Sequence, residues 1–160
     1  MPKDQAAEFI KKIRADFPDL TLKSGSQDYW SPGTSTITYD ARRGLLPLQY
    51  GLLHELAHAL LGHRLYESDF ELLKLEAEAW RKAASLGKKY GVHIREDHIQ
   101  NCLDTYRDWL HHRSACPKCG AHVLQVNDHT YRCFNCQTQW QVTSQRFVRS
   151  YRRLFKPKTA

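Results

Sequence analysis

The five residues from His54 to His58 constrain this chain more than any other feature, because they read His-Glu-Leu-Ala-His. On a helix, side chains four residues apart lie one above the other on the same face, so His54 and His58 can bind one metal ion. Glu55 lies one position along and can reach a water molecule on that metal. This pattern is typical of zinc hydrolases in which the glutamate acts as general base. The sequence therefore predicts a catalytic zinc site with Glu55 as the catalytic residue.

A second metal pattern consists of four cysteines in two pairs, with two residues inside each pair: Cys116, Cys119, Cys133 and Cys136. Two such pairs, here 13 residues apart, converge to a tetrahedral four-thiolate zinc site. Short strands are expected at residues 122–126, 130–134 and 139–143, which is typical of a zinc ribbon. A redox pair and an iron–sulfur cluster are the alternatives, but evenly spaced pairs with strands between them favour zinc. We therefore expect two zinc ions per chain, one catalytic and one structural.

The length of 160 residues, 41% of them hydrophobic, is enough for one domain with a packed core and a small metal-stabilised module. No apolar run approaches the roughly 18 residues of a membrane span, and charges occur throughout the first 30 residues. We therefore expect neither a membrane span nor a signal peptide. The fifth cysteine, Cys102, is alone, which argues against a disulfide framework. Together these features favour a cytoplasmic protein.

The charges are unevenly distributed along the chain. Residues 1–112 hold 15 Lys and Arg against 16 Asp and Glu, a net charge of −1, whereas residues 113–160 hold 9 against one, a net charge of +8. This asymmetry favours contact between the C-terminal part and nucleic acid, although a basic tail that only keeps the protein soluble is the alternative. The candidate phosphate-binding residues are Arg146, Arg149, Arg152 and Arg153. The aromatic residues among them either stack on bases or form the apolar side of a short helix.

Local patterns predict the secondary structure around the motif. Helices are expected over residues 4–15, from about Pro47 to Gly62, from Ser68 to about residue 90, and over 96–112. Ser68 and Glu71 form a capping box that opens the third of these helices. Residues 20–40 contain a Ser-Pro-Gly-Thr-Ser turn between β-favouring residues, which predicts a hairpin or a pair of short strands.

The third ligand of the catalytic zinc is expected on the helix after the motif. Glu76 lies four residues after Leu72 and four before Trp80, in the middle of an apolar stripe. A carboxylate at such a position is costly unless it is paired or bound to metal. Glu78 falls instead among basic residues on the solvent side of this helix. Glu76 is therefore the better ligand, and Glu78 is interpreted as an ordinary surface charge.

The remaining histidines fit a ligand role less well. His63 lies five residues after His58, whereas the metzincin pattern requires a Gly three residues on and a His six residues on. We interpret His63 as a surface residue, with a supporting contact to the metal site as the alternative. His93 and His98 have no spacing typical of ligands.

The stretch from His54 through His63, followed by Glu76-x-x-Ala79, resembles the ImmA/IrrE family of metallopeptidases over about residues 30–90. The resemblance implies that His54, His58 and Glu76 bind zinc and that Glu55 is the base. Taken with the cysteine pattern and the charge distribution, the sequence predicts an α+β fold: a mainly helical, zincin-like metallopeptidase domain over 1–112 with a short strand region, a β zinc ribbon over 113–143, and a basic tail over 144–160. The chain departs from the family at Trp80, where the family has an Asn or Asp. Such an acid steadies a ligand histidine in related zinc peptidases.

The expected function is a zinc-dependent metalloendopeptidase, with Tyr39 and Tyr50 as candidates for stabilising the oxyanion by chain position only. The family resemblance implies a protein substrate such as a nucleic-acid-bound regulator, to which the ribbon brings the protease. One alternative is a SprT-like protease of DNA-bound proteins, whose layout is similar but whose third ligand is a histidine. The other is a non-catalytic nucleic-acid-binding regulator with a retained zinc site. Glu55 argues against the non-catalytic alternative, and Trp80 argues mildly for it.

Overall fold

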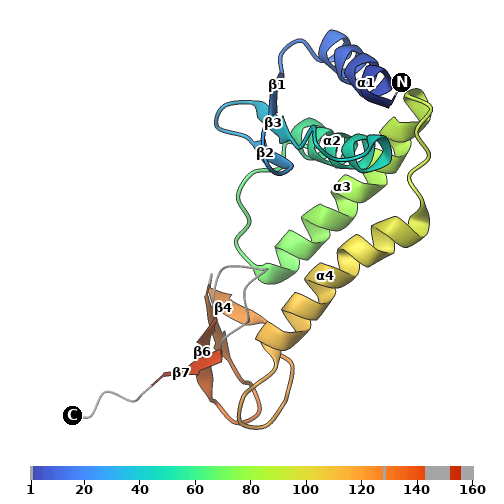
Figure 1. Ribbon diagram of the computed structural model, residues 1–160. Coiled ribbons are helices and arrows are strands. Elements are labelled where there is room, and N and C mark those ends of the chain that lie inside the picture. Colours follow the sequence, from blue (N-terminus) through green and yellow to red (C-terminus); the bar gives the residue numbers. More distant parts are fainter. Residues whose placement is uncertain (1, 128, 143–151, 156–160) are drawn as a thin grey trace. The chain divides into compact units, whose positions relative to one another are not determined.

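The computed structural model describes residues 2–127, 129–142 and 152–155 and confirms an α+β architecture. Four helices and two small sheets lie within these ranges (Figure 1). The chain divides into two compact units, residues 1–65 with 75–99 and residues 66–74 with 100–160. In the part of the chain that is described, no helix combines the length and the apolar character needed to cross a membrane.

The four helices lie close to their predicted positions. They are α1 (Pro2–Asp16), α2 (Leu45–Leu60), α3 (Asp69–Lys89) and α4 (Glu96–Ser114). Pro47 lies in the first turn of α2, where its missing N–H costs no intrahelical hydrogen bond. The Ser68 hydroxyl accepts a hydrogen bond from the Glu71 backbone N–H at 3.1 Å, which confirms the predicted cap of α3. Gly91, with a φ of +67°, follows the end of this helix.

The first unit contains a three-stranded sheet in the order β1-β3-β2, formed by β1 (Thr21–Ser24), β2 (Tyr29–Ser31) and β3 (Thr36–Tyr39). The antiparallel pair β2–β3 is the hairpin expected within residues 20–40. The sequence did not predict that β1 would pair with β3 in parallel. Helix α2 packs against β2, β3 and α1 (Figure 1) and buries the side of the helix that carries Leu52, Leu53 and Leu56.

The second unit contains an antiparallel four-stranded sheet in the order β4-β5-β6-β7: β4 (Gln125–Asn127), β5 (Thr130–Arg132), β6 (Gln139–Val142) and β7 (Arg152–Leu154). Its small core consists of Cys116, Tyr131, Cys133, Trp140 and Val142. The four-cysteine cluster together with β4–β6 is compatible with the predicted zinc ribbon. Strand β7 consists of residues that the sequence had placed in the basic tail.

A buried ion pair joins the start of α3 to the end of α4 within the second unit. The Arg113 Nε atom donates to the Asp69 carboxylate at 2.9 Å, and both side chains are almost fully buried. The Tyr131 hydroxyl also donates to Asp69, and the Trp140 indole N–H donates to the Arg113 carbonyl at 2.9 Å. Because a buried charge is costly when its partner is lost, these contacts fix the ribbon core against the ends of the two helices.

Candidate metal centres

Helices α2 and α3 bring together the two motif histidines and the predicted third ligand. His54 Nε2 lies 3.1 Å from His58 Nε2 and 3.0 Å from a Glu76 carboxylate oxygen, and the other Glu76 oxygen lies 3.4 Å from His58 Nε2. His54 and Glu76 are buried, at 8% and 7% exposure. The i, i+4 spacing in α2 places both imidazoles on one face of the helix. Glu76, on the apolar stripe of α3, faces these two imidazoles.

These separations fit a zinc ion. Zinc in proteins is tetrahedral, with nitrogen and carboxylate ligands at about 2.0–2.1 Å, so two such ligands lie about 3.3 Å apart. The three separations in this cluster run from 3.0 to 3.4 Å. Two histidines and one carboxylate are also a common ligand set of catalytic zinc, which leaves one tetrahedral position for water or substrate. The group can therefore hold a metal ion, and its chemistry favours zinc.

The electrostatics of the cluster favour an ionised Glu76. Burial alone would raise the pKa of Glu76, but hydrogen bonds with His54 and His58 outweigh it and lower the pKa below its ordinary value. Burial likewise opposes charge on His58, yet its contact with Glu76 raises the pKa of this imidazole. At His54 burial dominates and the pKa is lowered, which favours the neutral imidazole that binds metal.

Glu55 lies on α2 next to His54 and is half-buried. Burial raises the pKa of Glu55 to about 7, while the nearby His58 and the Trp30 backbone N–H act in the opposite direction. A carboxylate with a pKa near neutrality is suited to accepting a proton and then returning it. Glu55 therefore has the electrostatic character of a general base.

The interpretation of His63 as a surface residue is wrong. His63 is only 8% exposed, and its Nδ1 atom lies 2.9 Å from His58 Nδ1. Glu78, predicted as an ordinary surface charge, is partly exposed but lies 3.5 Å from His63 Nε2. The sequence did carry a signal for this arrangement. Gly62 ends α2 with a φ of +68°, and such a reversal turns the next residue back toward the last turn of the helix.

Trp80 lies flat against His54, with ring centroids 4.1 Å apart and an angle of 26° between the planes. The sequence placed Trp80 on the apolar stripe of this helix and marked it as a departure from a family pattern, but it did not predict the contact with His54. The two tyrosines proposed for the oxyanion are both buried. The Tyr50 hydroxyl donates to the His93 carbonyl at 2.7 Å, so this group is already engaged in a backbone contact.

The four predicted cysteines converge in the second unit. Cys116 and Cys136 have sulfur atoms 3.6 Å apart, and the sulfurs of Cys119 and Cys133 are 3.5 Å apart. Tetrahedral thiolates at about 2.3 Å from zinc lie about 3.8 Å from one another, and the four sulfur atoms here all lie within 4.8 Å of one another. This cluster can hold a metal ion.

The two Cys-x-x-Cys pairs of the second unit are followed by the same backbone turn. Gly120 N–H donates to the Cys116 carbonyl, Gln137 N–H donates to the Cys133 carbonyl, and both Gly120 and Gln137 have positive φ. A backbone N–H of Ala121 lowers the pKa of the Cys119 thiol. Hydrogen bonds from Thr138 lower the pKa of Cys136 to about 6. At Cys133 the backbone N–H groups of Cys136 and Asn135 act in the same direction, but burial and the neighbouring thiols outweigh them and raise the pKa to about 11. The thiolate form that a metal ion requires is therefore favoured at Cys119 and Cys136.

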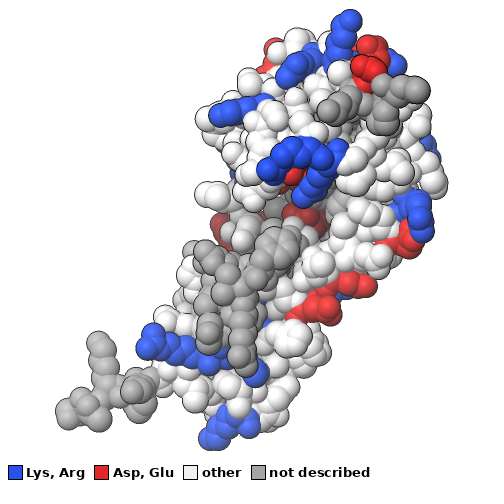
Figure 2. All heavy atoms as spheres, in the orientation of Figure 1, with Lys and Arg blue, Asp and Glu red and all other residues white. Residues whose placement is uncertain are grey.

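The predicted phosphate-binding arginines are only partly described. Arg152 and Arg153 lie in β7 and are exposed, whereas Arg146 and Arg149 lie outside the described residues. The Arg152 guanidinium donates to the Ala115 carbonyl at 2.7 Å, so this side chain also holds the ribbon together. Lys118 and Arg132 are exposed in the same unit. Figure 2 shows basic side chains on the visible face of the ribbon, consistent with a cationic surface.

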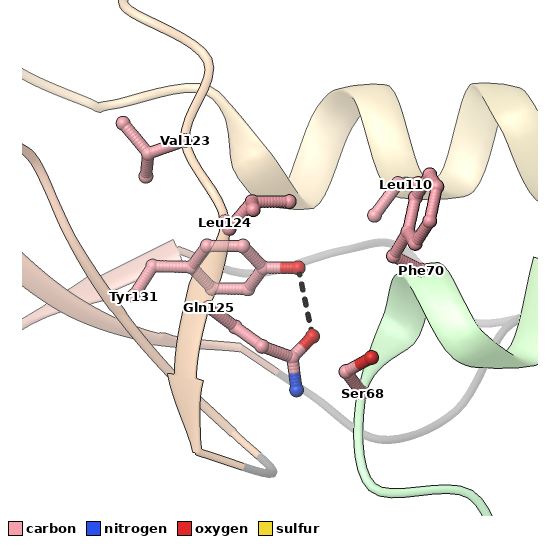
Figure 3. Close-up of a pocket in the computed structure, with 7 residues that line it drawn as sticks. All are labelled: Ser68, Phe70, Leu110, Val123, Leu124, Gln125 and Tyr131. Carbon is pink, nitrogen blue, oxygen red and sulfur yellow. Dashed lines mark hydrogen bonds between the residues drawn. The ribbon is translucent and has the colours of Figure 1, made fainter.

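A hollow of about 180 Å³ lies in the second unit and is lined mainly by apolar side chains (Figure 3). Its polar groups are already paired, because the Tyr131 hydroxyl contacts Gln125 and donates to Asp69. None of its lining residues is a candidate metal ligand or base. This hollow therefore offers no chemistry comparable to that of the two metal centres.

No family model, no curated protein and no solved structure matches this chain.

Proposed function

We propose that this protein is a zinc-dependent metalloendopeptidase with a zincin-like fold, similar to the ImmA/IrrE metallopeptidases. The convergence of His54, His58 and Glu76, with Glu55 beside them on α2, carries the proposal. A purely structural site has no need of a base at the position of Glu55. The burial that raises the pKa of this residue makes it suitable for proton transfer.

In the proposed reaction, a water molecule adds to the carbonyl carbon of a peptide bond, and the C–N bond then breaks. Zinc, when bound, polarises the carbonyl and lowers the pKa of the attacking water. Glu55 accepts the proton that this water loses and then gives it to the leaving amine. His54, His58 and Glu76 hold the ion, and the burial of His54 and Glu76 keeps bulk water away from these ligands.

The nature of the third ligand favours this proposal over a SprT-like protease. The SprT-like pattern requires a third histidine, whereas here the residue beside both motif histidines is Glu76 of α3. His63 lies against His58 through its Nδ1 atom, on the side of the ring away from Nε2. The resemblance to SprT-like proteins therefore rests on domain layout alone.

Metal removal tests the proposal directly. Stripping the full-length protein with a chelator is expected to abolish hydrolysis of a proteome-derived peptide library, because the carbonyl then lacks its Lewis acid. Adding zinc back after dialysis is expected to restore it. New N-termini are counted by mass spectrometry before stripping, after stripping and after zinc addition. Cleavage that persists unchanged in the stripped protein would contradict a metallopeptidase.

We propose further that the ribbon carries the protease to a nucleic-acid-bound substrate protein in the cytoplasm. The net charge of +8 over residues 113–160 and the exposed basic side chains of the ribbon support this role. Cations release counterions from phosphates on binding, so the affinity for DNA or RNA falls steeply with salt. A non-catalytic nucleic-acid-binding regulator would show the same salt dependence. The two proposals differ in whether Glu55 acts as a general base.

Arg153 offers a clean test of the nucleic-acid proposal, because Arg152 also contacts Ala115. The slope of log affinity against log salt is negative, and Arg153→Gln is expected to make it less steep by about 0.9 for duplex DNA. Fluorescence anisotropy with labelled duplex and single-stranded oligonucleotides over a salt series measures this slope. Arg107→Gln, in α4 of the same unit, serves as the matched control and is expected to leave the slope unchanged. Equal slopes for wild type and Arg153→Gln would remove Arg153 from the interface.

A further inference from the structure

His58 contacts a second histidine, His63, on the side of its ring away from the metal cluster. No metal-binding sequence pattern gives His63 a role. The His58 Nδ1 atom lies 2.9 Å from His63 Nδ1. The backbone fixes His63 in this place: its N–H donates to the His58 carbonyl at 3.0 Å, and its own carbonyl accepts the Trp30 indole N–H at 3.0 Å. The position of the His63 backbone is therefore set by the end of α2 and by strand β2.

The proton positions follow from the metal-binding geometry. The Nε2 atom of His58 faces His54 and Glu76 and must present a lone pair to bind a metal ion. The neutral His58 ring then carries its proton on Nδ1 and donates it to His63 Nδ1. This leaves the proton of His63 on Nε2, which faces the Glu78 carboxylate at 3.5 Å. The result is a chain from carboxylate through histidine to histidine that selects the binding tautomer of His58.

His54 is held in a different way. Its Nδ1 atom is buried and has no hydrogen-bond partner among the described residues. Ligand histidines usually donate this N–H to a carboxylate or a carbonyl. Here the ring lies against Trp80, with 4.1 Å between centroids, and Trp80 itself is buried at 6% exposure. The stacked Trp80 ring restricts the orientation of the His54 ring. In other metal sites a hydrogen bond at Nδ1 has this effect.

We infer that His63 and Trp80 are the positioning residues of the His54–His58–Glu76 centre, His63 through a hydrogen bond to His58 and Trp80 through stacking on His54. The inference rests on the metal centre of the proposed function and not on peptide hydrolysis. Groups that orient metal ligands typically contribute about 10–100-fold to metal affinity. His63 and Trp80 are therefore expected to affect metal binding although neither touches the ion.

The test is a chelator competition on the full-length, zinc-loaded protein. His63→Ala is expected to weaken zinc binding at this centre by about 10–100-fold and to leave the ribbon zinc unchanged, which serves as an internal control. His63→Asn is expected to recover most of the affinity, since its Oδ1 atom can accept from His58 in place of Nδ1. His93→Ala is the matched control, because His93 is exposed in the same unit. Circular dichroism checks that every variant folds.

Trp80 is tested by two substitutions that keep a large apolar side chain, because truncation to Ala would open a larger cavity in the core. Trp80→Leu removes the ring and is expected to weaken zinc binding by about tenfold. Trp80→Phe keeps a stacking ring and is expected to stay close to wild type. Cobalt substitution gives a second readout, because the d–d absorption of Co²⁺ reports ligand geometry and is expected to change in His63→Ala and Trp80→Leu only.

The outcomes separate the inference from the proposed function. If wild-type protein holds only the ribbon zinc, the metal centre and the inference both fail. If wild type holds two zinc ions and neither His63→Ala nor Trp80→Leu changes the affinity or the cobalt spectrum, only the inference is overturned. Loss of affinity in His63→Ala without recovery in His63→Asn would mean that packing, and not the hydrogen bond, explains the effect of His63.

Discussion

Replacing Glu55 by Gln is expected to lower the rate of peptide hydrolysis by about 10²–10⁴-fold, the usual contribution of a general base. The amide keeps the size of the side chain but cannot accept a proton from water. Glu55 is not among the clustered ligands His54, His58 and Glu76, so this variant is expected to retain both zinc ions. Activity would then be lost without loss of metal or of fold.

The rate is measured as the appearance of new N-termini in a proteome-derived peptide library, with zinc content determined in parallel. Glu8→Gln is the matched control, because Glu8 is exposed on α1. If the zinc-loaded wild type and Glu55→Gln produce the same termini at the same rate, the cleavage does not come from this site. Wild-type protein with two zinc ions and no cleavage of any peptide or protein would favour the non-catalytic regulator.

Local signals were sufficient to predict the four helices within a few residues. The third helix shows why: Ser68 caps its first turn, and Gly91 lies two residues after its end, so both ends are specified by neighbouring residues. The cap differs in one detail. The Glu71 carboxylate accepts the Glu67 backbone N–H at 2.7 Å, one residue before the predicted partner. Helix ends depend on contacts within a few residues, which a single sequence records.

Strand pairing was predicted less well, because it depends on residues far apart in the chain. The hairpin β2–β3 is local and was expected, but the parallel pairing of Leu22 with Ile37 needs a connection through β2. Likewise, Arg152 pairs with Val142 across β6 and β7, although the basic composition around it gave no strand signal. Only a tertiary contact, such as the hydrogen bond from Arg152 to Ala115, distinguishes this strand from a solvated tail.

The candidate metal ligands were found because metal chemistry demands particular residues at particular spacings. Glu76 was preferred to Glu78 as a ligand because it was expected to be buried. In the structure Glu76 is 7% exposed, whereas Glu78 is partly exposed. The supporting residues were not found, since a hydrogen bond or a stacked ring requires no fixed spacing from the ligand. His63 failed the metzincin spacing and was therefore assigned to the surface, although a position after Gly62 is also where a chain turns back on its helix.

Replacing Glu76 by Gln is expected to reduce the zinc content from two ions per chain to one. The substitution preserves the shape of the side chain but removes the negative charge, and a neutral amide is a poor zinc ligand. Two imidazoles alone leave the ion without the third protein ligand of a catalytic site. The loss is expected at the His54–His58–Glu76 centre only, because the four cysteines form a separate group that could hold the other ion.

Elemental analysis of dialysed protein measures this content, with Glu8→Gln as the matched control. Glu8 is exposed on α1 and lies outside the ligand cluster, so its variant is expected to retain two zinc ions. A single zinc ion in wild type and in both variants would mean that α2 and α3 hold no tightly bound metal. Of the two candidate metal centres, the four-cysteine cluster alone would then remain. The function would have to be sought in binding through the basic C-terminal part.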